Sequence, residues 1–271
     1  MEHVEILGLR IAFERTGSGP PLVLLHGGLS DGREWRRQLD GLAEDFTLVA
    51  WDAPGCGRSS DPPESFRMPD YADCLAQFID ILGLHRPHVL GLSWGGTLAL
   101  ELYRRRPRLP RTLLLASAYA GWAGSLPADA VAERLDSLLH ELEQPREQFA
   151  RSFIPSLLTD HAPAEMIDEL VAIMSDFHPA GCRPMLHAMA EADLRDVLPR
   201  IDVPTLLLYG DADVRSPLPV AQELCEQIPG STLVVIPGVG HQCNIEAAGL
   251  FNAAVRDFLR SHQPIEEPRT A

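Results

Sequence analysis

The sequence is short of positive charge. Its 23 lysine and arginine residues stand against 38 aspartate and glutamate residues, so the formal net charge is −15 at pH 7. A surface this acidic repels phosphate backbones and anionic lipid headgroups, which argues against nucleic acid or a membrane as partner. The chain also lacks any apolar run near the roughly 20 residues of a membrane-spanning helix. Residues 1–5 contain neither a basic cluster nor a long apolar core, so we expect no signal peptide.

Cysteine is scarce as well. The chain has five, an odd number, at positions without the spacing of metal ligands: Cys56, Cys74, Cys182, Cys225 and Cys243. Scattered cysteines are typical of reduced thiols, and we therefore expect a cytoplasmic protein without a metal site. The 271 residues and the hydrophobic share of 45% suffice for one large domain, with or without an inserted segment.

The most informative stretch is residues 88–97, which read His-Val-Leu-Gly-Leu-Ser-Trp-Gly-Gly-Thr. The stretch begins with an apolar run, continues with a serine between glycines and ends in a helical pattern. This order is typical of the Gly-x-Ser-x-Gly nucleophile elbow in its strand–turn–helix setting. Ser93 would occupy a tight, strained turn, where a side chain at Gly91 or Gly95 would collide with the neighbouring strand or helix. The alternative is a glycine-rich turn with a bystander serine, and the flanking strand and helix disfavour it.

Several apolar runs indicate a parallel sheet. Residues 22–25, 46–51, 111–116 and 205–209 are mainly apolar, as expected for strands buried on both faces. Helical patterns lie between these runs, and this alternation is typical of an α/β fold with a mostly parallel sheet flanked by helices. A short hairpin is expected over residues 4–15.

Between residue 119 and about residue 200 the strand pattern disappears. Amphipathic helical segments take its place, over a stretch too long for an ordinary connection between strands. We therefore predict an inserted helical cap over residues 119–200, with the α/β core formed by residues 1–118 and 201–262. The polar residues 263–271, which include two prolines, are expected to be a frayed tail.

A nucleophilic serine needs a base, and the base needs a carboxylate that holds its tautomer. His241 follows the last predicted strand, at the sheet edge where sites of open parallel sheets assemble. Asp211 and Asp213 both follow the preceding strand; the first is close enough to cap the turn, and the second is far enough out to reach the histidine. The chain order Ser, Asp, His is the one expected for an elbow of this kind. We predict a triad of Ser93, Asp213 and His241, with Asp211 as the less favoured acid.

Acyl transfer also needs two N–H donors for the oxyanion. One is expected from Trp94, which follows the nucleophile, and the other from Gly28 in the His-Gly-Gly stretch at 26–28. Losing one such donor typically costs about 3–4 kcal/mol of transition-state stabilisation. His26 is expected to support this loop by hydrogen bonds rather than to act as a second base.

With these motifs the chain resembles an α/β-hydrolase-fold serine hydrolase of the single-cap type. That group includes small esterases, enol-lactonases, carbon–carbon hydrolases, proline iminopeptidases and cofactor-free haloperoxidases. The likeness extends from about residue 11 to residue 259 and rests on motifs in family order: His-Gly-Gly at 26–28, Asp-x-Pro-Gly-x-Gly-x-Ser at 52–59, Gly-Leu-Ser-Trp-Gly-Gly at 91–96, Gly-Asp-x-Asp at 210–213 with Pro217 after it, and Gly-His at 240–241. The family often has Glu-x-Pro after the histidine; this chain has Glu246-Ala247-Ala248, which should affect only a helix start.

The resemblance implies hydrolysis of a small carboxylic ester or lactone through an acyl-enzyme on Ser93, without cofactor or metal. Relatives with dehalogenase or epoxide hydrolase activity carry aspartate at the elbow and are disfavoured. Within enzymes the alternatives are a carbon–carbon bond hydrolase and a proline iminopeptidase-like peptidase. Trp94 favours the peptidase, but the acidic residues that would bind a substrate amine cannot be identified. Outside enzymes, the alternative is a non-catalytic or slow ligand sensor on the same fold.

The substrate is expected to be a small molecule that binds under the cap, and the oligomeric state stays open. Large apolar residues of the cap are candidates for the pocket roof: Trp122, Phe149, Phe153, Met166, Phe177 and Met185. Ordinary packing between cap helices is the competing explanation for each of them. The acidic surface should repel strongly anionic substrates, unless an arginine such as Arg33 or Arg183 lies in the pocket.

Overall fold

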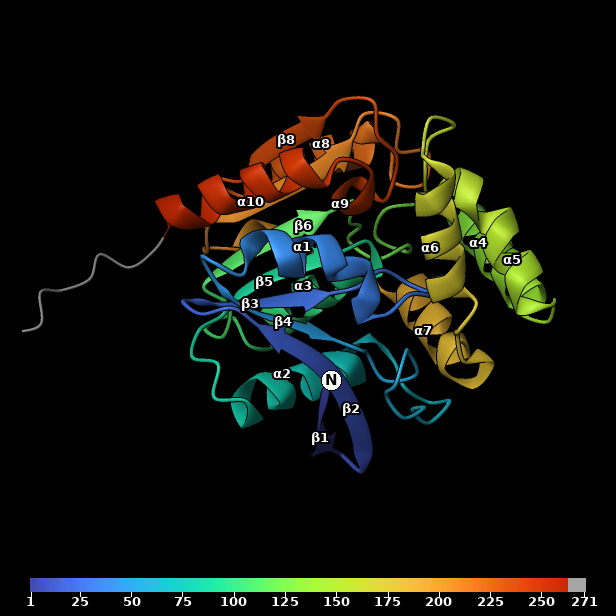
Figure 1. The fold of residues 1–271 in the computed structure, drawn as a ribbon, viewed down its shortest axis with the longest axis horizontal. Coiled ribbons are helices and arrows are strands. Elements are labelled where there is room, and N and C mark those ends of the chain that lie inside the picture. Colours follow the sequence, from blue (N-terminus) through green and yellow to red (C-terminus); the bar gives the residue numbers. More distant parts are fainter. Residues whose placement is uncertain (263–271) are drawn as a thin grey trace, which may run out of the picture.

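A sheet of eight strands runs through the centre of the molecule in the computed structural model, which describes residues 1–262 (Figure 1). The predicted frayed tail, residues 263–271, lies outside the described residues. The strand order is β1-β2-β4-β3-β5-β6-β7-β8. The strands are β1 Glu2–Ile6, β2 Leu9–Thr16, β3 Pro21–Leu25, β4 Thr47–Trp51, β5 His88–Leu92, β6 Thr112–Ala116, β7 Thr205–Gly210 and β8 Thr232–Ile236.

Only the first two strands depart from a parallel arrangement. β1 pairs antiparallel with β2, and β2 pairs antiparallel with β4, whereas β3 through β8 are parallel to one another. Every residue of β5, β6 and β7 is buried, which explains why these strands are apolar throughout rather than alternating. The prediction of a mostly parallel sheet flanked by helices is confirmed.

Helices cover both faces of the sheet (Figure 1). The helices of the α/β part are α1 Arg36–Leu42, α2 Met68–Ile81, α3 Trp94–Arg105, α8 Leu218–Gln227, α9 Cys243–Glu246 and α10 Ala248–Ser261. Apolar residues of α1 and α10 pack on one face, and those of α2, α3 and α8 pack on the other. Side chains alternate between the two faces along a strand. In β3, Leu22 and Leu24 therefore pack on the face covered by α1 and α10, whereas Val23 and Leu25 pack on the face covered by α2, α3 and α8.

Four further helices lie between β6 and β7, within the range 119–200. They are α4 Ala128–Glu141, α5 Arg146–Phe153, α6 Ala164–Met174 and α7 Pro179–Glu191, and a 3₁₀ turn, η2, covers Ile154–Ser156. Figure 1 shows them together at the carboxyl end of the parallel strands, on the right of the view. We call α4 to α7 the inserted helices. None of the described helices is both long and apolar enough to cross a membrane.

The ends of several helices have local causes. α7 begins at Pro179, because proline is well suited to the first turn of a helix. α9 and α10 are separated at Ala247, whose φ and ψ are −129° and 48°. A 3₁₀ turn at Gly32–Trp35, η1, directly precedes α1.

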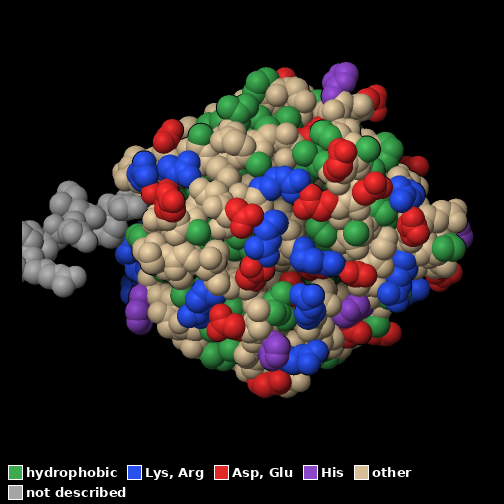
Figure 2. Space-filling view, in the orientation of Figure 1, with side chains coloured by type: hydrophobic (Ala, Val, Ile, Leu, Met, Phe, Trp, Pro, Cys, Tyr) green, Lys and Arg blue, Asp and Glu red, His purple; other side chains and the backbone are tan. Residues whose placement is uncertain are grey.

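The side of the molecule that is visible in Figure 2 is not uniformly acidic. Acidic and basic side chains are interspersed there over the whole visible side. The two signs of charge are therefore mixed on this side, and the charge of any individual pocket has to be judged from the residues that line it.

Candidate active site

Ser93 lies at a sharp turn between β5 and α3, in a backbone conformation that side chains rarely adopt. Its φ and ψ are 52° and −112°, and strain of this kind costs about 1–3 kcal/mol. A Cβ at Gly91 would lie 2.2 Å from the carbonyl oxygen of Gly95, and a Cβ at Gly95 would lie 2.2 Å from that of Leu25. The crowding expected at the elbow is therefore present, and only glycine fits on either side of the serine.

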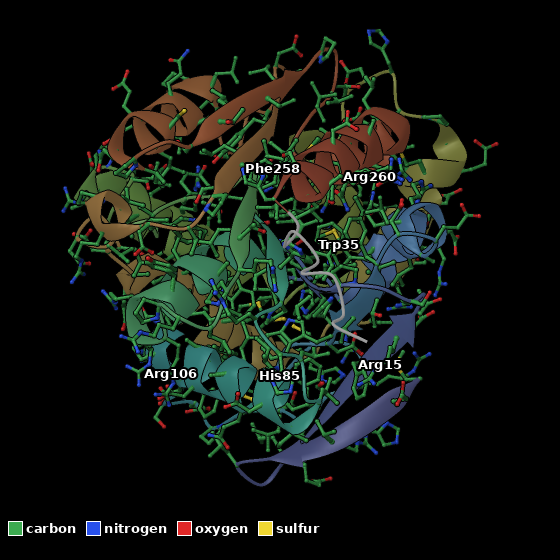
Figure 3. The ribbon with its side chains drawn as sticks, turned by 90° about the vertical axis from the view of Figure 1, so that its left-hand side faces the viewer. Arg15, Trp35, His85, Arg106, Phe258 and Arg260 are labelled. Carbon is green, nitrogen blue, oxygen red and sulfur yellow. The ribbon has the colours of Figure 1, made fainter. Side chains whose placement is uncertain are left out.

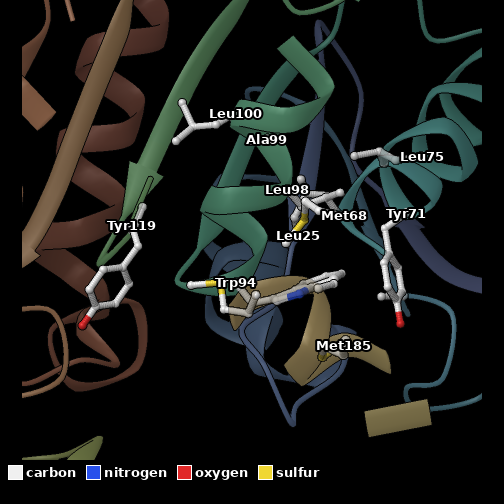
Figure 4. Packing of buried hydrophobic residues seen from close by; sticks show 14 of the residues in the cluster. Leu25, Met68, Tyr71, Leu75, Trp94, Leu98, Ala99, Leu100, Tyr119 and Met185 are labelled. Atoms are coloured by element: carbon white, nitrogen blue, oxygen red, sulfur yellow. The ribbon is translucent and has the colours of Figure 1, made fainter. Parts of the chain in front are cut away.

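Trp94 is the first residue of α3, so its backbone N–H has no acceptor within the helix. The positive end of the helix dipole lies at the same point. The indole is buried and meets the ring of Tyr71 edge to face, with 5.2 Å between centroids; Figure 4 shows it directed toward that residue. Packing thus fixes the residue after the serine and leaves its N–H free to face an oxyanion.

His241 and Asp213 meet on loops that follow neighbouring strands. Nδ1 of His241 lies 2.9 Å from Oδ2 of Asp213 and 3.1 Å from Oδ1, and both residues are buried. Oδ1 also accepts the backbone N–H groups of Arg215 at 2.9 Å and Ser216 at 2.8 Å. Burial alone would raise the pKa of Asp213, but the charge and hydrogen bond of His241 and the Ser216 N–H outweigh it and hold this pKa below its usual range. The carboxylate is therefore ionised at neutral pH and orients the imidazole.

Asp211, the less favoured acid, has a different partner. Its Oδ1 accepts the backbone N–H of Gly238 at 2.7 Å in an exposed turn. The structure therefore brings Asp213 rather than Asp211 to His241, and the aspartate close to the strand end holds a turn.

His85, just before β5, and His88, the first residue of β5, lie at the opposite end of this strand from Ser93. Figure 3 views the molecule from the side opposite the inserted helices and labels His85 there. His88 is fully buried, with Nδ1 2.8 Å from Oγ1 of Thr112. Burial, assisted by the charge of Arg111, lowers the pKa of His88 to about 4, so the ring is neutral. Among residues 1–262 no group of three or more His, Cys, Asp or Glu side chains is arranged to hold a metal ion.

His26 supports the loop that contains Gly28. Its Nε2 accepts the backbone N–H of Ala53 at 3.0 Å, so Nδ1 carries the proton and donates to the carbonyl oxygen of Gly27 at 2.8 Å. Burial lowers the pKa of this histidine, which is consistent with a neutral ring. Both ring nitrogens are engaged, as expected for a support rather than a base. Gly28 borders the same cavity as Ser93.

Glu34 is a buried acid behind this loop that no motif in the sequence indicates. Its Oε1 accepts the backbone N–H of Gly27 at 2.8 Å, and its Oε2 has no hydrogen-bond partner among the described residues. Burial raises the pKa of Glu34 to about 7. In the sequence it is one acidic residue in a helical segment, a pattern that normally indicates a solvated face, so no local signal distinguishes it.

One cavity has both Ser93 and His241 in its wall, together with Trp94 and Gly28. Its free volume is about 50 Å³, room for only a few water molecules. The elbow, the loop after β3 and the loop after β8 form its floor, and residues of the inserted helices form much of its roof. Four of the five residues predicted to act together therefore border one small cavity, and the fifth, Asp213, contacts His241.

The structure places only half of the predicted roof residues on this cavity. Those that line it are Trp122, Phe153 and Met185. Phe149 and Phe177 do not, which corrects the prediction for these two, and Met166 does not either. Phe149 and Phe177 instead meet each other edge to face, with 5.4 Å between ring centroids. The inserted helices bury apolar residues against one another as well as over the cavity, and periodicity does not separate the two surfaces.

Arginines reach the cavity from positions that the sequence did not indicate. Arg33 and Arg183, the expected candidates, do not border it; each pairs with acidic residues elsewhere. Arg134 of α4 and Arg215 of the loop after β7 do border it. An arginine on an amphipathic helix or a loop normally indicates a solvated charge, so neither residue could be singled out before the fold was known.

Curated proteins that resemble this chain include hydrolases of different kinds. The chain is 29% identical over 247 residues to a protein named putative carbamate hydrolase RutD from Pseudomonas savastanoi pv. phaseolicola, with 89% of this chain and 94% of the relative covered. It is 27% identical over 261 residues to a pimeloyl-(acyl-carrier protein) methyl ester esterase from Vibrio campbellii, with 93% and 99% covered.

A solved structure with a similar fold is that of a thermophilic esterase from Thermogutta terrifontis, described with malate bound. It superimposes with a TM-score of 0.90 at 29% identity and covers 97% of this chain and 100% of that chain. A sequence model described as the Alpha/beta hydrolase family matches residues 22–254, a range that includes the elbow and the loops carrying Asp213 and His241. The chain therefore belongs to the alpha/beta hydrolase family.

Proposed function

We propose that this protein is a serine hydrolase that cleaves a small carboxylic ester or lactone through an acyl-enzyme on Ser93. The observation that carries the proposal is the shared cavity wall of Ser93 and His241, with Asp213 holding Nδ1 of the histidine at 2.9 Å. Because Nδ1 is engaged, Nε2 is the nitrogen left to exchange a proton with the serine.

The proposed reaction has two balanced halves. Oγ of Ser93 forms a bond to the substrate carbonyl carbon while its proton passes to Nε2 of His241, and Asp213 stabilises the imidazolium. The backbone N–H groups of Trp94 and Gly28 receive the oxyanion. The tetrahedral intermediate then expels the alcohol, which takes the proton from the histidine. A water molecule repeats the same steps on the acyl-enzyme and releases the acid and the free serine.

The inserted helices act as the cap in this proposal. With about 50 Å³ of free volume and apolar residues such as Leu186 and Met189 in its wall, the cavity suits a small acyl or alcohol group. Two of the relatives are named as an esterase and a methyl ester esterase, which supports an ester as substrate. None of the described residues that line the cavity is acidic, which disfavours the binding of a substrate amine by an iminopeptidase.

Covalent labelling of Ser93 tests the proposal most directly. A fluorophosphonate probe should label the wild-type protein and not Ser93→Ala, and the variant should lose about 10³- to 10⁶-fold in turnover of an aryl ester. A folded wild-type protein that resists the probe would favour the ligand sensor. Equal turnover by Ser93→Ala would refute the acyl-enzyme.

A panel of substrates separates the enzyme alternatives. Aryl esters of graded chain length stand for the proposed class, a vinylogous diketone for a carbon–carbon hydrolase, and a proline anilide for a peptidase. We expect turnover of the short esters. Activity confined to the diketone or to the anilide would replace the proposed bond class with the corresponding alternative.

A further inference from the structure

The geometry points to a carboxylate-bearing substrate, whose carboxylate binds between Arg134 and Arg215 while its ester or lactone carbonyl reaches Ser93. This inference rests on the proposed function and narrows it from esters in general to esters or lactones that carry a second, ionised carboxyl group.

Two hollows share a wall at this point. Besides the catalytic cavity, a second hollow of about 460 Å³ lies at the surface between α4, α5 and η2. Four residues line both, namely Arg134, Leu138, Phe153 and Arg215. We call these four residues the neck, because they stand between the outer hollow and the cavity that contains Ser93.

The two arginines of the neck are held by uncharged groups. Arg215 lies over the ring of Phe153, with 4.3 Å from Cζ to the ring centroid, and donates to Oγ of Ser156 at 3.1 Å. Arg134 lies over the rings of Tyr119 and Trp122, at 5.9 and 5.3 Å. Neither guanidinium forms an ion pair within 4 Å with any carboxylate of residues 1–262. Stacking on aromatic rings orients both groups and leaves N–H donors without a charged acceptor.

The electrostatics of the neck favour an anion. Burial, and then the charge of Arg134, lower the pKa of Arg215 to about 10, so Arg215 is still cationic at neutral pH and is repelled by its neighbour. The charges of Asp213 and Glu141 act on the pKa of Arg215 in the opposite direction but do not outweigh burial and Arg134. Two partly buried cations without a directly paired carboxylate are unfavourable, and an anion between them would offset both the desolvation and the repulsion. The neck therefore has the opposite sign to the protein as a whole, whose net charge is −15.

Acidic residues lie near the neck on both sides. On the inner side, the carboxylate of Asp213 is held by Nδ1 of His241 and by the backbone N–H groups of Arg215 and Ser216, and it forms no ion pair with either guanidinium. Two further acidic residues lie on the outer side. Glu133 and Glu141 line the outer hollow and do not line the catalytic cavity. The carboxylate of Glu141 accepts the hydroxyl of Ser137 at 2.8 Å. The negative charges of Glu133 and Glu141 disfavour an anion in the outer hollow itself. The position for a carboxylate is therefore the neck, on the side that faces Ser93.

Guanidinium groups bind carboxylates through paired, charge-assisted hydrogen bonds whose geometry a neutral group cannot reproduce. A substrate with a carbonyl at Ser93 and an acyl-side carboxylate at the neck is a half-ester of a dicarboxylic acid or a lactone of a hydroxydicarboxylic acid. An ester of the same length that ends in a methyl group would leave both arginines without a charged acceptor.

The test compares matched pairs of methyl esters. Monomethyl succinate, glutarate and adipate are compared with methyl butanoate, pentanoate and hexanoate, which replace the carboxylate by a methyl group. For the length that fits best, we expect kcat/KM at neutral pH to favour the half-ester by at least about tenfold.

In Arg134→Gln and in Arg215→Gln the ratio of the two kcat/KM values should fall by about 10- to 100-fold, as expected for the loss of a charge-assisted hydrogen bond. Glu141→Gln, which changes a charge in the outer hollow only, should keep the ratio within about twofold. Equal kcat/KM values for both members of every pair, or a ratio that both arginine substitutions leave unchanged, would overturn the inference.

A binding measurement separates this inference from the proposed function. Free glutarate at about 10 mM should raise the melting temperature of Ser93→Ala, and should not do so when Arg134→Gln and Arg215→Gln are added to it. That result supports the carboxylate site even if the fluorophosphonate probe and all esters fail, in which case only the hydrolase function is refuted. If none of the three free dicarboxylates stabilises Ser93→Ala, the carboxylate site is refuted and ester hydrolysis is unaffected.

Discussion

The backbone N–H of Gly27 donates to Oε1 of the buried Glu34 at 2.8 Å. The next residue along the chain is Gly28, the proposed second donor to the oxyanion. A carboxyl group that water does not reach therefore supports one half of the proposed oxyanion site from behind. Because burial raises the pKa of Glu34 to about 7, this support changes its charge near neutral pH.

Glu34 should make the protein less stable as the pH rises through this range. Its pKa is about 7 in the folded state against 4.5 in the unfolded state, so between these values the folded state binds more protons. The free energy of unfolding should thus fall by about 3 kcal/mol from pH 4.5 to above pH 7, since each pH unit between the two pKa values contributes about 1.36 kcal/mol. Urea unfolding of wild type and Glu34→Gln at several pH values measures this contribution as the difference between the two slopes. Glu44→Gln makes the same chemical change at an exposed position and should keep the wild-type slope.

His88 should have the opposite effect. Its pKa is about 4 in the folded state against 6.5 in the unfolded state, so between these values the unfolded state binds more protons. The free energy of unfolding should fall by up to about 3 kcal/mol as the pH drops from 6.5 toward 4. His88→Asn removes this contribution, whereas His85→Asn, at an exposed position of the preceding turn, should not. Equal acid sensitivity of wild type and His88→Asn in urea unfolding would contradict the prediction.

Asp213 and Asp211 form a matched pair for testing the acid of the triad. Asp213→Asn should lower kcat for a short aryl ester by about 10⁴-fold, because the amide cannot hold the tautomer of His241. Asp211→Asn should cost less than about tenfold, since its partner is the N–H of Gly238 in a turn. Steady-state kinetics with a fluorophosphonate titration of active enzyme separates turnover from folding. A larger loss in Asp211→Asn than in Asp213→Asn would reverse the assignment.

Glycine substitutions test the crowding at the elbow. Gly95→Ala places a Cβ 2.2 Å from the carbonyl oxygen of Leu25, so we expect a loss of several kcal/mol in the free energy of unfolding or failure to fold. Gly249→Ala is the control: nothing lies within 4 Å of its added Cβ, and it is exposed near the start of α10. It should be neutral or stabilising by up to about 1 kcal/mol. Thermal unfolding followed by circular dichroism measures both.

The fold was predictable because its signals are local. Each buried strand is a continuous apolar run, and the elbow combines a strand, a crowded turn and a helix within ten residues. The prediction that the chain resembles the α/β hydrolases is confirmed by the family match over residues 22–254. The proximity of Asp213 and His241 followed from topology, since both lie on loops at the carboxyl edge of a parallel sheet. The catalytic roles of Ser93, Asp213 and His241 stay predictions.

The lining of the cavity was much less predictable, because it depends on how the inserted helices pack. Phe149 and Phe153 are four residues apart on α5 and so lie on one face, yet only Phe153 borders the cavity. Arg134 and Glu34 have the sequence context of solvated charges. Their surroundings depend on tertiary contacts that no local pattern encodes. Arg134 lies over the ring of Trp122, and Glu34 accepts the backbone N–H of Gly27.

Glu246 has a consequence for protein engineering. It joins the N–H of Gly240, next to His241, to the N–H and hydroxyl of Thr159 among the inserted helices. The inserted helices are therefore not a module that can be exchanged freely between relatives. A chimaera that takes residues 119–200 from another protein must supply a donor equivalent to Thr159, or the loop that carries the histidine loses this anchor.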